Sequence, residues 1–246
     1  MKYQWRKMKF IIILSSVFIL TACPSSKEKI QSYIAQPSTR KDSLETKSCE
    51  ELKKEIEKSR KQLSLQFSQS STPGKNELIE EIKKSWVNTF SNDLYQQWKN
   101  TPWDFNGTTA KPGKGNIACG FFVATLLQDM GLKINRRKLS VCASSLMMKS
   151  LVPKQPLKNL SQLSYPDFNE KLKEYGIGVY ITGLDYHTGF IVNDGKENWL
   201  IHSNYIGRKG VTKEAVMNSV TLKSSKTRWI VSLTGDKDFL QRWLNG

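Results

Sequence analysis

The chain has 246 residues, a formal net charge of +16 and a hydrophobic content of 38%. This length accommodates one well-cored domain with an appendage, or two small domains. The excess of Lys and Arg would suit a nucleic-acid binder. These residues are, however, spread along the chain without a basic helix or a base-stacking module, so we predict no nucleic-acid partner.

The N-terminus has the pattern of an exported lipoprotein precursor. A basic start precedes an apolar run over residues 10–20, which is shorter than the roughly 20 apolar residues that cross a bilayer. The run ends in Leu20-Thr21-Ala22-Cys23, which resembles the bacterial lipobox, where a peptidase cuts before a lipid-modified Cys. We therefore predict a signal peptide over residues 1–22 and a mature chain that begins at lipid-bearing Cys23. An ordinary N-terminal anchor with a chance Cys is the alternative.

The segment after Cys23 predicts where the protein lies. Acyl chains on Cys23 hold a protein on a membrane, and Ser25 in place of Asp is typical of outer-membrane sorting in cells with two membranes. Residues 23–43 are polar and carry Pro, which indicates a flexible tether. At the cell envelope a basic surface suits anionic lipids, glycans or acidic peptides, and solubility explains the charge equally well.

Residues 44–98 predict a helical N-terminal segment. The stretch 44–67 mixes acidic and basic residues around sparse apolar positions, which favours an exposed helix. A break at 70–74 precedes a second helix over 76–98, where apolar residues recur every four positions and indicate one buried stripe.

Residues 99–246 predict helices followed by strands, and hence an α+β fold. Residues 101–116 are rich in Gly and Pro and indicate a loop. Helices are expected over 117–130, 139–151, 167–175 and 238–244, and strands over 179–184, 188–192, 199–202 and 227–233. The turn at 193–195 joins the second and third strands.

Three residues form a candidate catalytic set. The chain has two histidines, His187 and His202, which flank the 193–195 turn and face each other unless the strand register slips by one residue. Cys119 lies at the start of the 117–130 helix, where the helix dipole and free N–H groups stabilise a thiolate. Thiol hydrolysis needs a nucleophile, a base and a group that orients the base, and these residues fit that order. A small buried Cys and ordinary core or surface histidines are the alternative readings.

A glycine close to His187 adds to this pattern. Gly189 follows His187 by two residues, and a glycine in a strand permits close approach to the backbone. We expect a substrate to use that space.

Four segments resemble motifs of the NlpC/P60 peptidases. Residues 115–123 (GNIACGFFV) resemble the Asp-Cys-Ser-Gly-Phe nucleophile segment, and residues 187–192 (HTGFIV) resemble the strand that carries the base. Residues 200–203 (LIHS) resemble the strand whose His orients the base, and residues 101–108 (TPWDFNGT) resemble the Pro-Tyr-x-x-Gly-Gly loop. The resemblance covers residues 98–205.

The resemblance implies a papain-like fold in which a nucleophile helix packs on a small antiparallel sheet, preceded here by the N-terminal helices. It also implies a cysteine peptidase or amidase (a hydrolase) that acts on peptidoglycan stem peptides with a Cys-His-His mechanism. The sequence departs from the family at Ala118, Gly120 and Trp103, and the histidines are further apart than usual. The chemistry therefore carries over better than the substrate.

Two other functions stay open at this point. One is a non-catalytic envelope binding or scaffold lipoprotein with the same fold. The other is a papain-like enzyme that acts on protein or acyl substrates.

Four further residues are candidate substrate contacts. Trp103 is a substrate platform or a lid on the core, and Asp104 and Asn116 line the cleft or are ordinary polar loop residues. Asp185 precedes His187 by two residues, so in a strand it shares a face with that residue and tunes it. The alternative for Asp185 is a solvated turn carboxylate.

The remaining cysteines and the motif inventory predict neither a metal nor a cofactor. Cys49 and Cys142 form a disulfide in an oxidising compartment, or all three remaining thiols are free. The sequence has no CxxC or HExxH spacing for a metal, and it has no GxGxxG or GxxxxGK[ST] pattern for a nucleotide.

Overall fold

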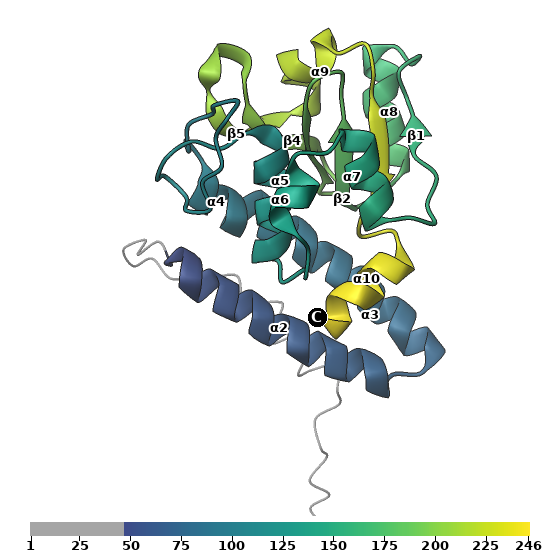
Figure 1. Ribbon diagram of the computed structural model, residues 1–246. Coiled ribbons are helices and arrows are strands. Elements are labelled where there is room, and N and C mark those ends of the chain that lie inside the picture. Colours follow the sequence, from purple (N-terminus) through teal and green to yellow (C-terminus); the bar gives the residue numbers. More distant parts are fainter. Residues whose placement is uncertain (1–46) are drawn as a thin grey trace, which may run out of the picture. The chain divides into compact units, whose positions relative to one another are not determined.

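The computed structural model describes residues 47–246 (Figure 1). The predicted signal peptide, the lipid site at Cys23 and the tether over 23–43 lie outside the described residues, as does the beginning of the segment predicted from residue 44. Within residues 47–246, no helix combines the length and the apolar character that crossing a membrane requires.

Most of the helices precede a run of antiparallel strands along the chain, as expected for an α+β fold. The helical elements are α2 (Cys49–Gln69), α3 (Thr72–Asn88), the π-helix η1 (Thr89–Leu94), α4 (Tyr95–Trp98), α5 (Cys119–Asp129), α6 (Arg136–Ser140), α7 (Ser144–Leu151), α8 (Tyr165–Glu174), the 3-10 turns η2 (Ile206–Arg208) and η3 (Val216–Asn218), α9 (Val220–Ser224) and α10 (Lys237–Asn245). The strands are β1 (Lys158–Asn159), β2 (Gly178–Gly183), β3 (Thr188–Asn193), β4 (Asn198–Asn204), β5 (Gly210–Ala215) and β6 (Trp229–Ser232).

The six strands form one antiparallel sheet in the order β1-β6-β2-β3-β4-β5. The meander β2-β3-β4-β5 runs through consecutive neighbours. The turn between β3 and β4 uses Gly195 with a φ of +88°, a conformation that glycine adopts without steric cost. The register pairs Phe190 with Ile201 and Leu200 with Glu214, which determines the faces on which the histidine strands present their side chains.

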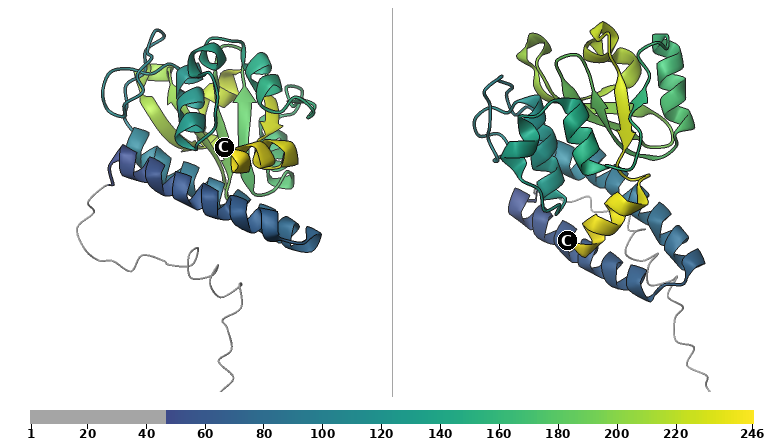
Figure 2. Two further views of the ribbon diagram at one scale, coloured as in Figure 1. Left: turned by 60° about the horizontal axis from the view of Figure 1, so that its bottom comes forward. Right: turned by 45° about the vertical axis from the view of Figure 1, so that its right-hand side comes forward.

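Both faces of the sheet are covered by helices, and each face has its own apolar core. One face packs Ile181, Phe190 and Ile201 against α3, α5, α7 and α10, with α2 outside this layer. The other face packs Ile191 and Leu200 against α8 and α9. Figure 2 shows the sheet between these two groups of helices. Burial on both faces explains the short continuous apolar runs at 179–181, 190–192 and 199–201 in β2, β3 and β4.

The N-terminal helices form a hairpin that packs on the remainder of the described chain. Ser48 and Glu51 close a capping box at the start of α2, and buried Arg60 of α2 donates hydrogen bonds to the Trp243 and Leu244 carbonyls at the end of α10. These carbonyls lie in the last turn of α10, where the Trp243 carbonyl also accepts the Gly246 N–H at 3.3 Å. The guanidinium adds hydrogen bonds to this helix end and complements the helix dipole.

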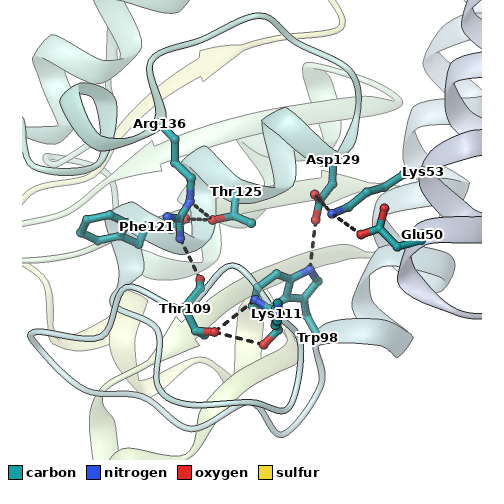
Figure 3. Close-up of polar contacts among 9 residues, drawn as sticks. All are labelled: Glu50, Lys53, Trp98, Thr109, Lys111, Phe121, Thr125, Asp129 and Arg136. Carbon is teal, nitrogen blue, oxygen red and sulfur yellow. Dashed lines mark hydrogen bonds and ion pairs between the residues drawn. The ribbon is translucent and has the colours of Figure 1, made fainter.

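Asp129 joins α2 to the end of α5. It accepts a hydrogen bond from Trp98 Nε1 at 3.3 Å and lies 3.1 Å from Lys53 Nζ of α2 (Figure 3). Burial raises the pKa of the Asp129 carboxyl, and the neighbouring ammonium of Lys53 opposes that rise. The N-terminal hairpin is thereby tied to the helix that begins at Cys119.

The long second helix carries a local irregularity. It ends at Trp98 as predicted but begins at Thr72, four residues before the predicted start, and residues 89–94 have π-helical hydrogen bonding. Within this segment Phe90 stacks on Trp86 at a centroid distance of 5.6 Å and meets Phe190 of β3 edge-on at 4.7 Å. The π-helical segment therefore lies directly beneath the strand that follows His187.

One predicted helix needs correction, and several elements were not predicted. The helix expected over 139–151 is two helices, because α6 starts earlier at an Asn135 cap and ends at Ser140 before α7 begins. Strand β5 and helix α9 were not predicted at all. The G-V-T-K-E-A sequence of β5 lacks an apolar alternation because both of its faces carry polar residues.

Candidate active site

The loop before α5 holds the start of that helix against the sheet. Ala118 caps α5 in an extended conformation and donates its N–H to the Gly107 carbonyl at 2.8 Å, so Cys119 becomes the first helical residue. Ser203 of β4 donates its hydroxyl to the Ile117 carbonyl at 2.7 Å. Gly107 is required at this crossing because a Cβ there would lie 2.6 Å from the Asn116 backbone. The segment before Cys119 is thus bonded to the residue that follows His202.

Helix packing explains why residue 120 is a glycine. A Cβ at this position would lie 2.2 Å from the Ser140 carbonyl oxygen, so α6 can cross the first turn of α5 only over a glycine. The contact between α5 and α6 therefore requires glycine at position 120.

The two histidines lie side by side, as the hairpin argument predicted. His187 Nε2 is 2.7 Å from His202 Nδ1, their rings meet edge-on, and both side chains are buried. The expected role of Gly189 was wrong: a Cβ there would lie 2.8 Å from the Cβ of His202. The space above Gly189 is filled by His202 and leaves no room there for a substrate.

Glu214 extends this pair on its far side. His202 Nε2 lies 3.3 Å from Glu214 Oε1. The pairing of His202 with Thr212 and of Leu200 with Glu214 places both side chains on the α8 face of the sheet. Burial alone would raise the pKa of Glu214, but His202 and the Ser219 hydroxyl together lower it, so the group is a carboxylate.

Cys119 and His187 line the same cavity, which has a volume of about 910 Å³. The backbone N–H groups of Thr188, Gly120 and Cys119 itself lower the pKa of the Cys119 thiol, but burial outweighs them. His187 Nδ1 is buried and has no hydrogen-bond partner within residues 47–246, so no hydrogen bond joins it to the thiol. This nitrogen is nevertheless the ring atom left available for a proton from the pocket.

Burial dominates the electrostatics of these groups. It raises the pKa of the Cys119 thiol even though three N–H groups oppose the rise. It lowers the pKa of His187 well below the usual value, with a contribution from the neighbouring ring of His202. Burial also lowers the pKa of His202, against the opposing effect of Glu214. At neutral pH the site therefore holds a thiol and neutral imidazoles, whereas the sequence argument had expected conditions that favour a thiolate.

Aromatic side chains form one wall of the pocket. The Tyr205 ring lies 5.1 Å from the His187 ring and 6.2 Å from the Trp103 ring, measured between centroids. All three residues line the cavity. Trp103 is thus at the predicted pocket, and Tyr205 is a neighbour that the sequence argument missed although it follows β4 directly.

The other three predicted contacts lie outside the lining of the pocket. Asp104 accepts a hydrogen bond from the Asn106 N–H at 2.9 Å and lies 3.4 Å from Arg208 Nη2, while Asn116 is exposed. Asp185 accepts hydrogen bonds from the N–H groups of Lys226 and Thr227. It lies in the turn between β2 and β3, so the strand alternation used to place it beside His187 does not apply.

The described cysteines carry free thiols. Cys49, Cys119 and Cys142 are each unpaired and partly buried, so no disulfide joins Cys49 to Cys142. Within residues 47–246, no group of three or more His, Cys, Asp or Glu side chains is arranged to hold a metal ion.

Comparison with known proteins found no family model, curated protein or solved structure that matches this chain.

Proposed function

We propose that this chain is a lipid-anchored thiol hydrolase with a papain-like, NlpC/P60-type active site that cleaves amide bonds in peptidoglycan stem peptides. The observation that carries the proposal is one shared pocket. Cys119 lies there at the start of a helix, beside a buried His187 whose second nitrogen is 2.7 Å from His202. The sequence motifs supply the family and the substrate class.

The contacts of the two rings assign the tautomers. The Glu214 carboxylate favours a proton on His202 Nε2, which leaves Nδ1 of that ring as an acceptor. The proton of His187 then resides on Nε2, and Nδ1 keeps its lone pair toward the pocket. His187 is thereby held in the form that accepts a proton from Cys119.

The first half of the reaction forms an acyl-enzyme. His187 Nδ1 takes the thiol proton while the sulfur bonds to the amide carbonyl carbon, and the carbonyl π electrons move to the oxygen. In this mechanism the N–H of Cys119, the first residue of α5, donates to that oxyanion. When the carbonyl reforms, the C–N bond breaks, and the His187 imidazolium donates its proton to the departing amine.

The second half returns the enzyme to its starting state. His187 Nδ1 takes a proton from water, and the oxygen bonds to the thioester carbon. Collapse of this intermediate breaks the C–S bond and releases a carboxylic acid, and the sulfur recovers its proton from His187. Because burial disfavours both the thiolate and the imidazolium, each proton transfer accompanies the bond change.

The direct test is incubation of the mature chain with purified peptidoglycan, followed by mass spectrometry of the soluble fragments. We expect stem-peptide fragments from the wild type, almost none from Cys119→Ala or His187→Ala, and a smaller loss for His202→Ala. Circular dichroism of each variant establishes that it is folded. Full activity of Cys119→Ala would refute the mechanism.

A non-catalytic envelope lipoprotein is the second candidate. The protonated thiol and the absent Cys119–His187 hydrogen bond within residues 47–246 favour it. Fragments that are absent for every variant, together with an unreactive Cys119, support this alternative. A reactive Cys119 without fragments points to protein or acyl substrates.

A further inference from the structure

The pocket around Cys119 has an uneven charge. Arg136 and Arg137 line it, and none of its lining residues is Asp or Glu. Glu214 contacts the far side of His202 and does not line the cavity. A substrate in this pocket therefore meets positive side chains without a compensating negative one.

Arg136 is fixed in the wall by neutral groups. Its guanidinium donates to the Thr125 hydroxyl at 2.7 Å and to the Thr108 and Thr109 carbonyls at 2.9 and 2.7 Å. It also lies over the Phe121 ring, 4.9 Å from the centroid (Figure 3). A partly buried guanidinium normally pairs with a carboxylate. Here its charge is left to act on the cavity.

Arg137 is the adjacent cation, and it differs from Arg136 in being exposed. Among residues 47–246 it has no ion pair, and its side chain donates no hydrogen bond. Arg137 directly follows Arg136 in the chain. Because its side chain makes no internal contact of this kind, its guanidinium can bind a ligand in the cavity without breaking one. A guanidinium binds a carboxylate through two parallel N–H groups.

We propose that this pocket selects substrates with a carboxylate close to the scissile amide, and that Arg137 is the specificity residue that binds it. The inference rests on the proposed function for the reaction, whereas the charge of the pocket stands independently of turnover. Apolar groups of the substrate would lie against Trp103 and the exposed ring of Phe105, which also line the cavity.

The electrostatic part of the proposal is tested with two reagents of nearly equal size. The full-length chain carries Cys23→Ser, Cys49→Ser and Cys142→Ser, so that Cys119 is its single thiol. Alkylation rates are measured with anionic iodoacetate and with neutral iodoacetamide. The ratio of the iodoacetate rate to the iodoacetamide rate in the folded chain is divided by the same ratio for the chain unfolded in urea. Both reagents attack the same thiolate, so the pKa of Cys119 cancels.

We expect the folded chain to favour iodoacetate, and Arg137→Gln to lower the ratio about threefold or more. The preference should disappear in about 1 M salt, where the screening length is about 3 Å. Lys138→Gln is the matched control, because it removes an equal charge from the next residue, which lines a different cavity. A ratio equal to that in urea, or an equal effect of both variants, overturns the proposal.

The substrate part uses a stem-peptide fragment as the free acid and as its carboxamide. We expect the acid to have the higher kcat/KM and Arg137→Gln to abolish that preference, while Lys138→Gln retains it. Equal cleavage of both forms by the wild type overturns the proposal and leaves the hydrolase intact. If neither form is cleaved while the iodoacetate preference depends on Arg137, the proposed function fails and the anion-binding pocket stands.

Discussion

Glu214 touches neither the sulfur nor the cavity, and its contact with His202 Nε2 is its connection to the reaction. Glu214→Gln removes the carboxylate charge and retains the shape of the side chain. It thereby allows an NH₂ group to face His202 and favours the wrong tautomer. We expect kcat to fall about tenfold with little change in KM, because the substrate pocket is untouched.

Glu214→Asp is the control for this prediction, since it restores the charge at a slightly greater distance. It should recover part of the lost kcat. A change confined to KM, or an equal loss in both variants with a lowered Tm, would indicate a structural role only.

The Cys119 thiol should lose its proton at a higher pH than an ordinary thiol. Because burial raises its pKa, the thiolate fraction is small at neutral pH and increases through the alkaline range. The rate of Cys119 alkylation by iodoacetamide should therefore rise with a midpoint above that of the same thiol in urea. Mass spectrometry of the Cys119 peptide at a series of pH values measures this. A plateau already reached near pH 7 would instead indicate a thiolate–imidazolium pair.

At the scale of the elements, α6 can cross α5 only because residue 120 has no Cβ. Gly120→Ala would place a methyl group 2.2 Å from the Ser140 carbonyl oxygen, and backbone atoms would have to move. We expect a loss of about 2 kcal/mol in the free energy of unfolding, as for other overpacked sites. Urea titration monitored by tryptophan fluorescence measures it.

Gly74→Ala is the matched control, since that glycine lies in the first turn of α3 and a Cβ there makes an ordinary 3.4 Å contact with Ser70. It should be neutral or slightly stabilising. Equal stability of Gly120→Ala and the wild type would show that α6 moves aside at no cost.

The elements that could be predicted were those with a periodic apolar pattern. Helices α2, α3, α5, α8 and α10 and strands β2, β3, β4 and β6 all have one, and each lies close to its predicted range. Strand β5 escaped prediction because its side chains at 212–214 are polar on both faces. Since Glu214 lies on that strand, the partner of His202 was missed with it.

The histidine pair could be predicted because a hairpin register relates residues that are near in sequence. Tyr205 and Arg137 were not identified as pocket residues, since their proximity to Cys119 comes from the packing of β4 and α6 around α5. Asp185 was misplaced because the residues between β2 and β3 form a turn, to which strand alternation does not apply. Contacts of this kind depend on tertiary structure and leave no periodic signal in the sequence.

At the scale of the whole molecule, the buried histidines predict a loss of stability in mild acid. Both pKa values are lowered on folding, so below about pH 6.5 the unfolded chain binds more protons than the folded chain. Stability is therefore retained above that pH and is lost as the pH falls. We expect each histidine to contribute a slope approaching about 1.4 kcal/mol per pH unit.

Urea titrations between about pH 7 and about pH 5 measure this slope. The double variant His187→Gln, His202→Gln removes both titrating groups, so its free energy of unfolding should depend much less on pH over the same range. A wild-type stability that stays constant over this range would mean that the rings are charged in the folded chain.

The protonated state of Cys119 also bears on how long the proposed enzyme stays active. Hydrogen peroxide oxidises the thiolate and reacts slowly with the thiol, so a raised pKa protects the sulfur from conversion to sulfenic and sulfinic acids. At the envelope location proposed above, no cytosolic glutathione pool is present to reverse such damage. A nucleophile that loses its proton only when a substrate carbonyl is in place is thus less exposed to oxidative inactivation between turnovers.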